Sequence, residues 1–347
     1  MPRIAVVTSS PPFVEGGHLV IARALVQALR ERDHDAELIV TPSNRFGRQA
    51  SAYIANWMTD VGRTGAGQRV DQVISTRYPS YAVRHERHVC WLNHPMREYY
   101  DLWASWSATL SPQGRLKESV RRALIQAADT YLFKHNVAKL FAQSKTVQDR
   151  LTRWNSVASE VLYPPPPQRH YHCADYGDFL FAYSRLAPLK RLDLVVEALA
   201  TPAAAGVRCV IGGDGEERGR LEALMHERGI GDRISFVGQL ADDELTTYLA
   251  TCRAVVFVPK DEDYGMVTIE AFASAKPVIT ASDSGAPVEL VVSGVNGQVV
   301  APTADALGTA MAQLAGDRAL AERLGQAAAA RAAEITWDAA VSKLVLK

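Results

Sequence analysis

Short apolar runs and longer amphipathic stretches alternate along the first half of the chain. The apolar run over 3–8 predicts a strand, residues 18–32 repeat apolar positions with the period of an α-helix, and 36–41 predicts a second strand. Strand, helix and strand in this order are the start of a parallel α/β unit. A long amphipathic helix is predicted near 113–132. The other strands of this half are predicted at 72–75, 88–92, 140–143 and 160–162.

Four consecutive prolines, Pro164 to Pro167, interrupt the alternation. Proline cannot continue a helix or a central strand and favours a stiff extended connection, so we predict an interdomain linker here. The domains would cover 1–165 and 166–334, with a last helix at about 335–347.

The alternation restarts after the prolines. Strands are predicted at 179–183, 207–211, 234–237, 254–258 and 277–280. Helices are predicted at 192–200, 216–228, 242–251, 268–275, 304–314 and 318–333. The strands are continuous apolar runs, which is typical of parallel strands covered on both faces. The whole pattern therefore predicts two Rossmann-like α/β domains in tandem.

The composition is that of a soluble globular protein, with 347 residues, 48% of them hydrophobic and 22% charged. This length suits two domains, each with its own core. No apolar run approaches the roughly 18–20 residues of a membrane span. Met1-Pro2-Arg3 leads directly into the first strand, without the apolar region of a signal peptide. We therefore expect a cytoplasmic protein that is neither disordered nor fibrous.

The cysteines follow no spacing that would indicate a metal site or a disulfide. Cys90, Cys173, Cys209 and Cys252 are far apart, and three of them lie in apolar stretches. We expect free thiols in a reducing compartment. His170 lies close to Cys173, but without a second group of ligands we predict no metal site there. The Asp261 and Asp263 pair is discounted for the same reason.

The net charge of zero conceals a polarised chain. Residues 1–170 contain 22 Lys+Arg and 14 Asp+Glu, whereas 171–347 contain 16 and 24, so the balances are +8 and −8. Basic residues gather on the long predicted helix at Arg115, Lys117, Arg121 and Arg122. Such a cluster suits an anionic acceptor or the inner face of an anionic membrane, and mutual attraction of the domains is the other explanation. Nucleic-acid binding is not expected, because no basic motif interleaved with aromatic residues is present.

Two adjacent glycines, Gly16 and Gly17, follow the first strand and open the first helix. Free N–H groups at a helix N-terminus favour an anion, and glycine allows its close approach. A tight turn is the plainer interpretation. The dinucleotide pattern G-x-G-x-x-G is absent from this turn, which disfavours a dehydrogenase.

Two cations, Arg185 and Lys190, directly follow the first strand of the second domain. Open α/β sheets bind ligands beyond the carboxyl ends of their strands, so these side chains could neutralise a diphosphate. Solvated surface charges are the alternative. Further along, Gly213 and Gly215 resemble a phosphate loop, but we favour ordinary turn chemistry for them.

The most specific local segment is 261–271. Glu262 falls in the loop before a predicted helix, and Glu270 falls one to two turns inside that helix. Two carboxylates in these places suit hydrogen bonds from sugar hydroxyls, and a plain helix with acidic caps is the alternative. The N–H groups at the helix start, which are suited to an anion, belong to Gly265, Met266 and Val267.

Glu262-x7-Glu270 and the apolar stretch after it resemble the E-x7-E segment of the retaining glycosyltransferase family 4. That family has the GT-B fold, in which two Rossmann-like domains face each other across a cleft. Further segments resemble the family in the same order: the Gly16-Gly17 loop, Arg185 with Lys190, 213–215, 236–240 and 294–297. The segment 335–338 resembles the point where the family's last helix crosses back onto the first domain.

The resemblance implies roles for these residues, with the acceptor on the first domain and the donor on the second. Arg185 and Lys190 would hold the donor's diphosphate, and the Gly16-Gly17 pair would let donor and acceptor approach each other. Glu270 would bind the ribose hydroxyls, and Glu262 would bind those of the donor sugar. Backbone contacts would come from Leu240 to the nucleobase and from Gly265, Met266 and Val267 to phosphate or sugar.

The segment 91–101 resembles an H-x-x-R segment found in part of the family. It implies that His94 positions the donor sugar or the acceptor and that Arg97 is an acceptor-side cation. A structural histidine at a strand end is the alternative for His94. The aromatic-rich helix expected next to it favours core packing over a sugar-stacking platform, and it contains Tyr99, Tyr100, Trp103 and Trp106.

We therefore expect a retaining, metal-independent glycosyltransferase of the hexosyltransferase type. It would move a sugar from a nucleoside-diphosphate donor, UDP or GDP, to a hydroxyl acceptor in polysaccharide, glycolipid or secondary-metabolite biosynthesis, with no further cofactor. The departing phosphate can itself take the acceptor proton, so no protein base is obligatory. A GT-B nucleotide-sugar epimerase and an inactive nucleotide-sugar-binding relative are the alternatives. Peripheral contact with the inner membrane face is left open.

Overall fold

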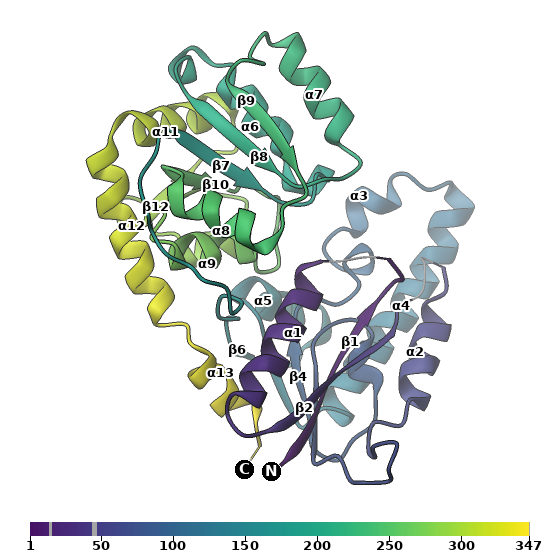
Figure 1. Cartoon of the computed structure of the whole chain (residues 1–347). Coiled ribbons are helices and arrows are strands. Elements are labelled where there is room, and N and C mark those ends of the chain that lie inside the picture. The colour runs from purple at the N-terminus through teal and green to yellow at the C-terminus, as the bar shows by residue number, and fades with distance from the viewer. Residues whose placement is uncertain (14–15, 44–46, 347) are drawn as a thin grey trace. The chain divides into compact units, whose positions relative to one another are not determined.

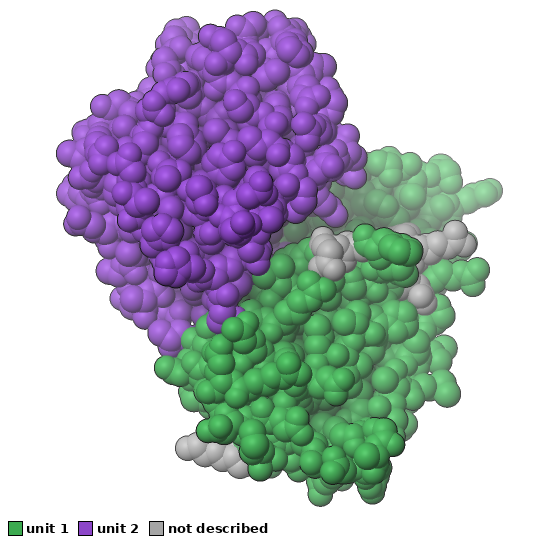
Figure 2. All heavy atoms as spheres, viewed as in Figure 1, with its two compact units in different colours: residues 1–164, 337–347 green, residues 165–336 purple. Residues whose placement is uncertain are grey.

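The chain forms two α/β units in the computed structural model, which describes residues 1–13, 16–43 and 47–346 (Figures 1 and 2). Unit 1 contains residues 1–164 and 337–347, and unit 2 contains residues 165–336. Each unit contains a six-stranded sheet, and every strand pair in the described residues is parallel. The predicted pair of Rossmann-like folds is confirmed.

The sheet of unit 1 has the strand order β2-β1-β3-β4-β5-β6 (Figure 1). Its strands are β1 (Arg3–Ser10), β2 (Asp35–Pro42), β3 (Gln72–Ser75), β4 (His88–Leu92), β5 (Lys139–Ala142) and β6 (Glu160–Val161). Its helices before the linker are α1 (Gly17–Arg30), α2 (Gln49–Met58), α3 (Trp103–Ser107), α4 (Pro112–His135) and α5 (Lys145–Asn155). Parallel neighbours need crossover connections, and these helices provide them.

The last helix, α13 (Trp337–Leu344), packs against α1 of unit 1. The buried Gln72 amide donates to the Leu344 carbonyl at 2.6 Å, and the Leu346 N–H donates back to the Gln72 side chain at 2.8 Å. The Trp337 ring meets Trp91 edge to face at 6.2 Å. The predicted return of the last helix to the first domain is therefore confirmed.

The sheet of unit 2 has the strand order β12-β11-β10-β7-β8-β9. Its strands are β7 (Phe179–Tyr183), β8 (Arg208–Gly212), β9 (Ile234–Gly238), β10 (Ala254–Val256), β11 (Val278–Ala281) and β12 (Gly297–Val300). Its helices are α6 (Leu192–Leu199), α7 (Arg218–Glu227), α8 (Asp242–Thr251), α9 (Met266–Ala273), α10 (Pro287–Leu290), α11 (Ala304–Gly316) and α12 (Arg318–Ala333). A large core cluster of aliphatic side chains from these strands and helices fills the unit.

Four helices or strands were not predicted: α2, α5, α10 and β12. In α2 the pattern is inverted, because Gln49 and Asn56 are buried while Ile54 and Trp57 are exposed. A search for an apolar stripe facing a core therefore misses this helix. In β12 only Gly297 is buried, so no continuous apolar run marks the strand.

The cysteines are free, as predicted. Burial raises the pKa of the Cys90, Cys209 and Cys252 thiols to about 12. Cys173 is exposed. Within the described part of the chain, none of the helices combines the length and the apolar character needed to cross a membrane.

Candidate functional site

The predicted site residues of unit 2 gather where the strand order of its sheet reverses. β7 and β10 are neighbours, and the chain continues in opposite directions across the sheet from them. Open α/β sheets bind ligands beyond the carboxyl ends of the strands at such a point. Arg185 and Lys190 follow β7, and Glu262 follows β10, so the topology places all three at this edge.

Lys190 and Glu262 form an ion pair at this edge. The Lys190 Nζ lies 2.6 Å from Glu262 Oε2, and the side chains are 23% and 18% exposed. Lys190 also lies over the Phe257 ring, 5.6 Å from its centroid. The ammonium is thus held in place and half-buried, whereas the Arg185 side chain is exposed. An anionic ligand at this edge would meet one oriented cation and one that reaches it from solvent.

The backbone of the Glu262 loop is fixed by the loop after β11. The Glu262 N–H donates to the Ser284 carbonyl at 2.9 Å, and the Glu262 carbonyl accepts from the Ala286 N–H at 3.0 Å. Because both backbone groups are bonded, the side chain projects from a defined position. Glu262 lies in a loop, as predicted.

Gly265 is the N-cap of α9 and has φ +72°. A Cβ atom here would lie 2.6 Å from the Phe257 ring, so the position requires glycine for conformation and for space. Met266 and Val267 are the first two residues of α9, as predicted, and N–H groups in this position have no intrahelical acceptor.

Glu270, in the second turn of α9, is buried and accepts hydrogen bonds from three side chains. Its Oε2 accepts from the Tyr183 hydroxyl at 2.7 Å, and its Oε1 accepts from the Tyr171 hydroxyl at 3.0 Å and from the Arg169 guanidinium. Arg169 also pairs with Asp242 at 2.8 Å. Burial raises the pKa of the Glu270 carboxyl, and Arg169 and the two tyrosines oppose that rise.

Sequence analysis missed these three partners of Glu270. Arg169 and Tyr171 follow the proline run and Tyr183 ends β7, so they are far from Glu270 in sequence. The sequence did contain a signal for two of them, because a cation, Arg169, and a hydroxyl, Tyr171, directly follow the linker. We considered that segment only as a possible metal site. The His170 and His172 rings lie close together, with centroids 5.2 Å apart and a tilt of 40° between their planes.

The remaining glycine-rich turn of unit 2 acts as a turn. Gly213 has φ +116°, and a Cβ there would lie 1.9 Å from the Ser184 carbonyl oxygen. The backbone of this segment therefore requires glycine, which fits the turn chemistry that we favoured. Leu240, the predicted contact to the nucleobase, follows β9. Its side chain packs closely on Gly212, because a Cβ atom added to Gly212 would lie only 2.7 Å from it.

In unit 1 the strand order reverses between β1 and β3. Gly16 caps α1 and Gly17 is its first residue, so this pair opens the helix directly after β1, as predicted. His94 follows β4 at the same edge, and its Nδ1 lies 2.6 Å from the Pro95 carbonyl oxygen.

His18 joins this group and was not assigned from sequence. Burial, together with the nearby charges of Arg77, His94 and Arg23, lowers its pKa to about 3. The imidazole is therefore neutral at pH 7 among cationic neighbours. Its position directly after Gly17 was the only signal in the sequence.

Arg97 lies in an internal charge cluster. It pairs with Asp101 at 2.5 Å, and Arg150 reaches the same carboxylate at 3.1 Å. All three side chains are largely buried, and the two guanidiniums share one carboxylate. The predicted cation is present, but any acceptor must share it with Asp101.

The aromatic segment is packed in the core, as favoured from sequence, but it is not one helix. A single 3₁₀ turn, Arg97–Tyr99, is followed by α3. Tyr99 and Tyr100 are buried against Ile125. The backbone leaves the helical region at Tyr100, with φ −122° and ψ −107°, so the turn and α3 are separate elements.

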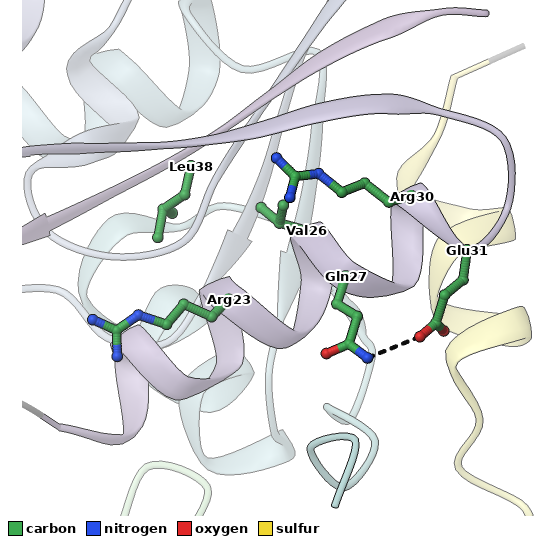
Figure 3. Close-up of a pocket in the computed structure, with 6 residues that line it drawn as sticks. All are labelled: Arg23, Val26, Gln27, Arg30, Glu31 and Leu38. Atoms are coloured by element: carbon green, nitrogen blue, oxygen red, sulfur yellow. Dashed lines mark hydrogen bonds between the residues drawn. The ribbon is translucent and has the colours of Figure 1, made fainter.

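A separate hollow of about 430 Å³ lies between α1 and β2 (Figure 3). It contains none of the predicted site residues. Its lining is Arg23, Val26, Gln27, Arg30, Glu31 and Leu38. The Gln27 amide donates to Glu31 at 2.9 Å, so two of its polar groups bond to each other (Figure 3).

Comparison with known proteins shows that unit 2 resembles a known protein family. Residues 174–331 match the family model described as "Glycosyl transferases group 1", which is nearly all of unit 2. Unit 2 belongs to the group 1 glycosyltransferases. The "GDP-mannose-dependent alpha-(1-6)-phosphatidylinositol monomannoside mannosyltransferase" of Mycobacterium tuberculosis is 35% identical over 174 residues, which are 46% of this chain and 44% of that protein. The match thus spans less than half the length of this curated relative.

Solved structures extend the likeness from unit 2 to the fold of the whole chain. Sucrose-phosphate synthase from Thermosynechococcus elongatus aligns with TM-score 0.73 and 19% identity, over 98% of this chain and 97% of its own. HepE from Anabaena, solved in complex with UDP and glucose, aligns with TM-score 0.70 and 17% identity over 98% of both chains. The chain therefore has the GT-B glycosyltransferase fold, as the E-x7-E resemblance implied.

Proposed function

We propose that this glycosyltransferase moves a sugar from a nucleoside-diphosphate sugar, bound by unit 2, to a hydroxyl acceptor. The observation that carries the proposal is the Lys190–Glu262 pair beside the N-terminus of α9. An oriented cation, free helix N–H groups and a carboxylate that suits sugar hydroxyls meet at the strand-order reversal of a matched glycosyltransferase unit.

The chemistry follows from where charge develops. Breaking the bond between the sugar C1 and the diphosphate oxygen leaves negative charge on the phosphate, and Arg185, Lys190 and the N–H groups of Met266 and Val267 would stabilise it. Fixed groups aimed at developing charge favour the transition state over the ground state. The acceptor oxygen bonds to C1 on the same face, and its proton passes to the departing phosphate oxygen. Retention and metal independence follow from this route.

Glu270 imposes a condition on donor binding. A carboxylate offers about four lone-pair positions to hydrogen-bond donors. Arg169, Tyr171 and Tyr183 use three of them, so a ribose diol that donates two hydrogen bonds must displace one partner. We assign this displacement to Tyr171, because Arg169 is also held by Asp242 and the Tyr171 contact is the longer of the two tyrosine contacts.

The acceptor would bind at the carboxyl edge of unit 1, with Arg97 as its predicted cation. Gly16 and Gly17 stay predicted to let donor and acceptor approach each other, and His94 to position the donor sugar or the acceptor. We add His18 as a neutral hydrogen-bonding group beside them. Leu240 stays the predicted contact to the nucleobase. The relatives support UDP and GDP alike, because the solved HepE complex contains UDP and the mycobacterial relative is named for GDP-mannose.

The deciding experiment offers UDP- and GDP-sugars with and without hydroxyl acceptors. Release of nucleoside diphosphate that depends on an acceptor, with a product of unchanged anomeric configuration by NMR and activity that survives EDTA, is the expected result. An altered sugar nucleotide formed without an acceptor would assign an epimerase instead. Tight binding without turnover would assign a binding protein.

A further inference from the structure

Exposed apolar side chains are concentrated on two helices of unit 1. Of the thirteen large hydrophobic residues that are exposed in the described chain, seven lie on α2 and α4. They are Ile54, Trp57, Met58, Leu116, Val120, Leu124 and Tyr131. Concentration of this kind marks an interaction surface, whereas scattered exposed apolar residues need no explanation.

These residues do more than share a face, because most of them line one groove. The groove has a volume of about 1140 Å³ and runs between α2 and α4. Ile54 and Trp57 line it from α2, and Val120, Leu124 and Tyr131 line it from α4. We call this surface, with Met58 and Leu116, the α2–α4 face.

The charges of the α2–α4 face are all positive. Arg48, Lys117 and Arg121 line the groove, and its lining contains no acidic residue. The acidic residues of α4 are turned inward: Glu118 is buried and accepts from Tyr99 and Arg121, and Asp129 is fully buried. Burial of both carboxylates leaves the solvent side of α4 apolar and cationic.

Apolar and cationic groups are also ordered along α4. Lys117 and Arg121 belong to the first half of the helix, and Leu124 and Tyr131 follow. At 1.5 Å per residue, Lys117 and Tyr131 are roughly 21 Å apart along the axis. A crossover helix starts at the carboxyl edge of its parallel sheet. The cations therefore lie nearer the edge of unit 1 that carries His94.

We propose that the α2–α4 face docks on an anionic lipid bilayer. The exposed apolar side chains would enter the interface, and Lys117 and Arg48 would contact anionic head groups. Charge decides between this partner and a second copy of the chain, because a two-fold dimer through this face would place its cations opposite one another. The inference deepens the proposed function by placing the acceptor edge of unit 1 at a membrane, but it is carried by unit 1 alone.

The test uses the full chain in co-sedimentation with vesicles of phosphatidylcholine alone or with 30% phosphatidylglycerol. Val120→Ser with Leu124→Ser removes apolar contacts, and Lys117→Glu reverses a charge. Both changes are at exposed positions, so folding is preserved. The matched controls are Val292→Ser with Val295→Ser, equally exposed on unit 2, and Lys134→Glu, an exposed lysine of α4 outside the groove.

We expect binding to the anionic vesicles that weakens about tenfold in each test variant and much less in the controls. Three results would overturn the proposal: equal binding to neutral vesicles, equal loss in Lys134→Glu, or no binding. A self-association by ultracentrifugation that Val120→Ser with Leu124→Ser abolishes would assign the face to a second copy instead. Nucleotide binding, measured by thermal shift, should be unchanged in all variants. If the membrane proposal fails, the proposed donor site of unit 2 can therefore still be tested on its own.

Discussion

At the scale of single residues, Lys190 is the cation on which the proposed chemistry most depends. Lys190→Ala should lower kcat by about two to three orders of magnitude, because it removes an oriented positive charge from the departing diphosphate. Glu262→Gln should lower turnover with a smaller effect on nucleotide affinity, since we assign its carboxylate to the hydroxyls of the donor sugar. Initial rates of nucleoside diphosphate release measure both. Lys260→Ala, an exposed lysine two residues before Glu262, is the control. Wild-type rates in both test variants would contradict the site.

Removing the partner of Glu270 that we expect to be displaced should strengthen nucleotide binding, whereas the two changes above weaken activity. Tyr171→Phe frees one lone pair of the carboxylate and should tighten UDP or GDP binding by about two- to tenfold, the value of one hydrogen bond. Calorimetric titration measures the affinity. A 2′-deoxynucleotide, which lacks one of the competing hydroxyls, should gain less from the change. Weaker binding by Tyr171→Phe would mean that the Tyr171 hydroxyl contacts the nucleotide rather than competing with it.

At the scale of elements, the strands and the position of E-x7-E were predictable, and the partners of Glu270 were not. Apolar runs such as 179–183 are local, and β7 has these bounds. Glu262 and Glu270 are placed by the start of one helix, which local sequence also determines. Arg169, in contrast, reaches Glu270 across 101 positions. Contacts of this kind depend on tertiary packing, which cannot be predicted from the spacing of apolar residues along the sequence. The missed α2 has the same cause, since its apolar residues face outward.

Gly265 tests how the loop before α9 controls the site. Gly265→Ala should destabilise unit 2 by more than the roughly 1–2 kcal/mol of a positive φ alone, because the new Cβ meets the Phe257 ring, and it should weaken nucleotide binding. Gly294→Ala is a matched control, with φ +79° and no atom within 4 Å of the new Cβ. Urea unfolding followed by circular dichroism compares them. Equal losses in both variants would show that the contact with Phe257 has no role.

At the scale of the whole molecule, the division of charge follows the division into units. Unit 1 contains 23 Lys+Arg and 15 Asp+Glu, and unit 2 contains 15 and 23, so the neutral chain consists of a basic unit and an acidic unit. The six tryptophans are divided even more sharply, because all of them belong to unit 1. Tryptophan fluorescence therefore reports the unfolding of unit 1 separately from that of unit 2.

Because tryptophan fluorescence follows unit 1 alone, it can measure how the buried Asp129 affects the stability of that unit. Asp129 accepts from the hydroxyls of Tyr53, Tyr81 and Tyr100, which join α2, the turn Ser80–Ala82 and the aromatic segment to α4. Burial raises its pKa from 3.8 to about 6, although the three hydroxyls act in the opposite direction. Below about pH 3 the carboxyl is mostly protonated in both the folded and the unfolded state. Between pH 4 and 6 only the unfolded state ionises freely, so this group makes folding less favourable as pH rises.

Asp129→Asn removes that titration and keeps an oxygen acceptor for the tyrosines. The free energy of unfolding of wild type, relative to Asp129→Asn, should therefore fall by about 2 kcal/mol between pH 4 and pH 7. Groups that titrate alike in both proteins cancel in this difference. Urea unfolding followed by tryptophan fluorescence at each pH measures it. A difference that stays constant with pH would show that Asp129 ionises in the folded state as readily as in the unfolded one. The tyrosine hydroxyls would then fully offset its burial.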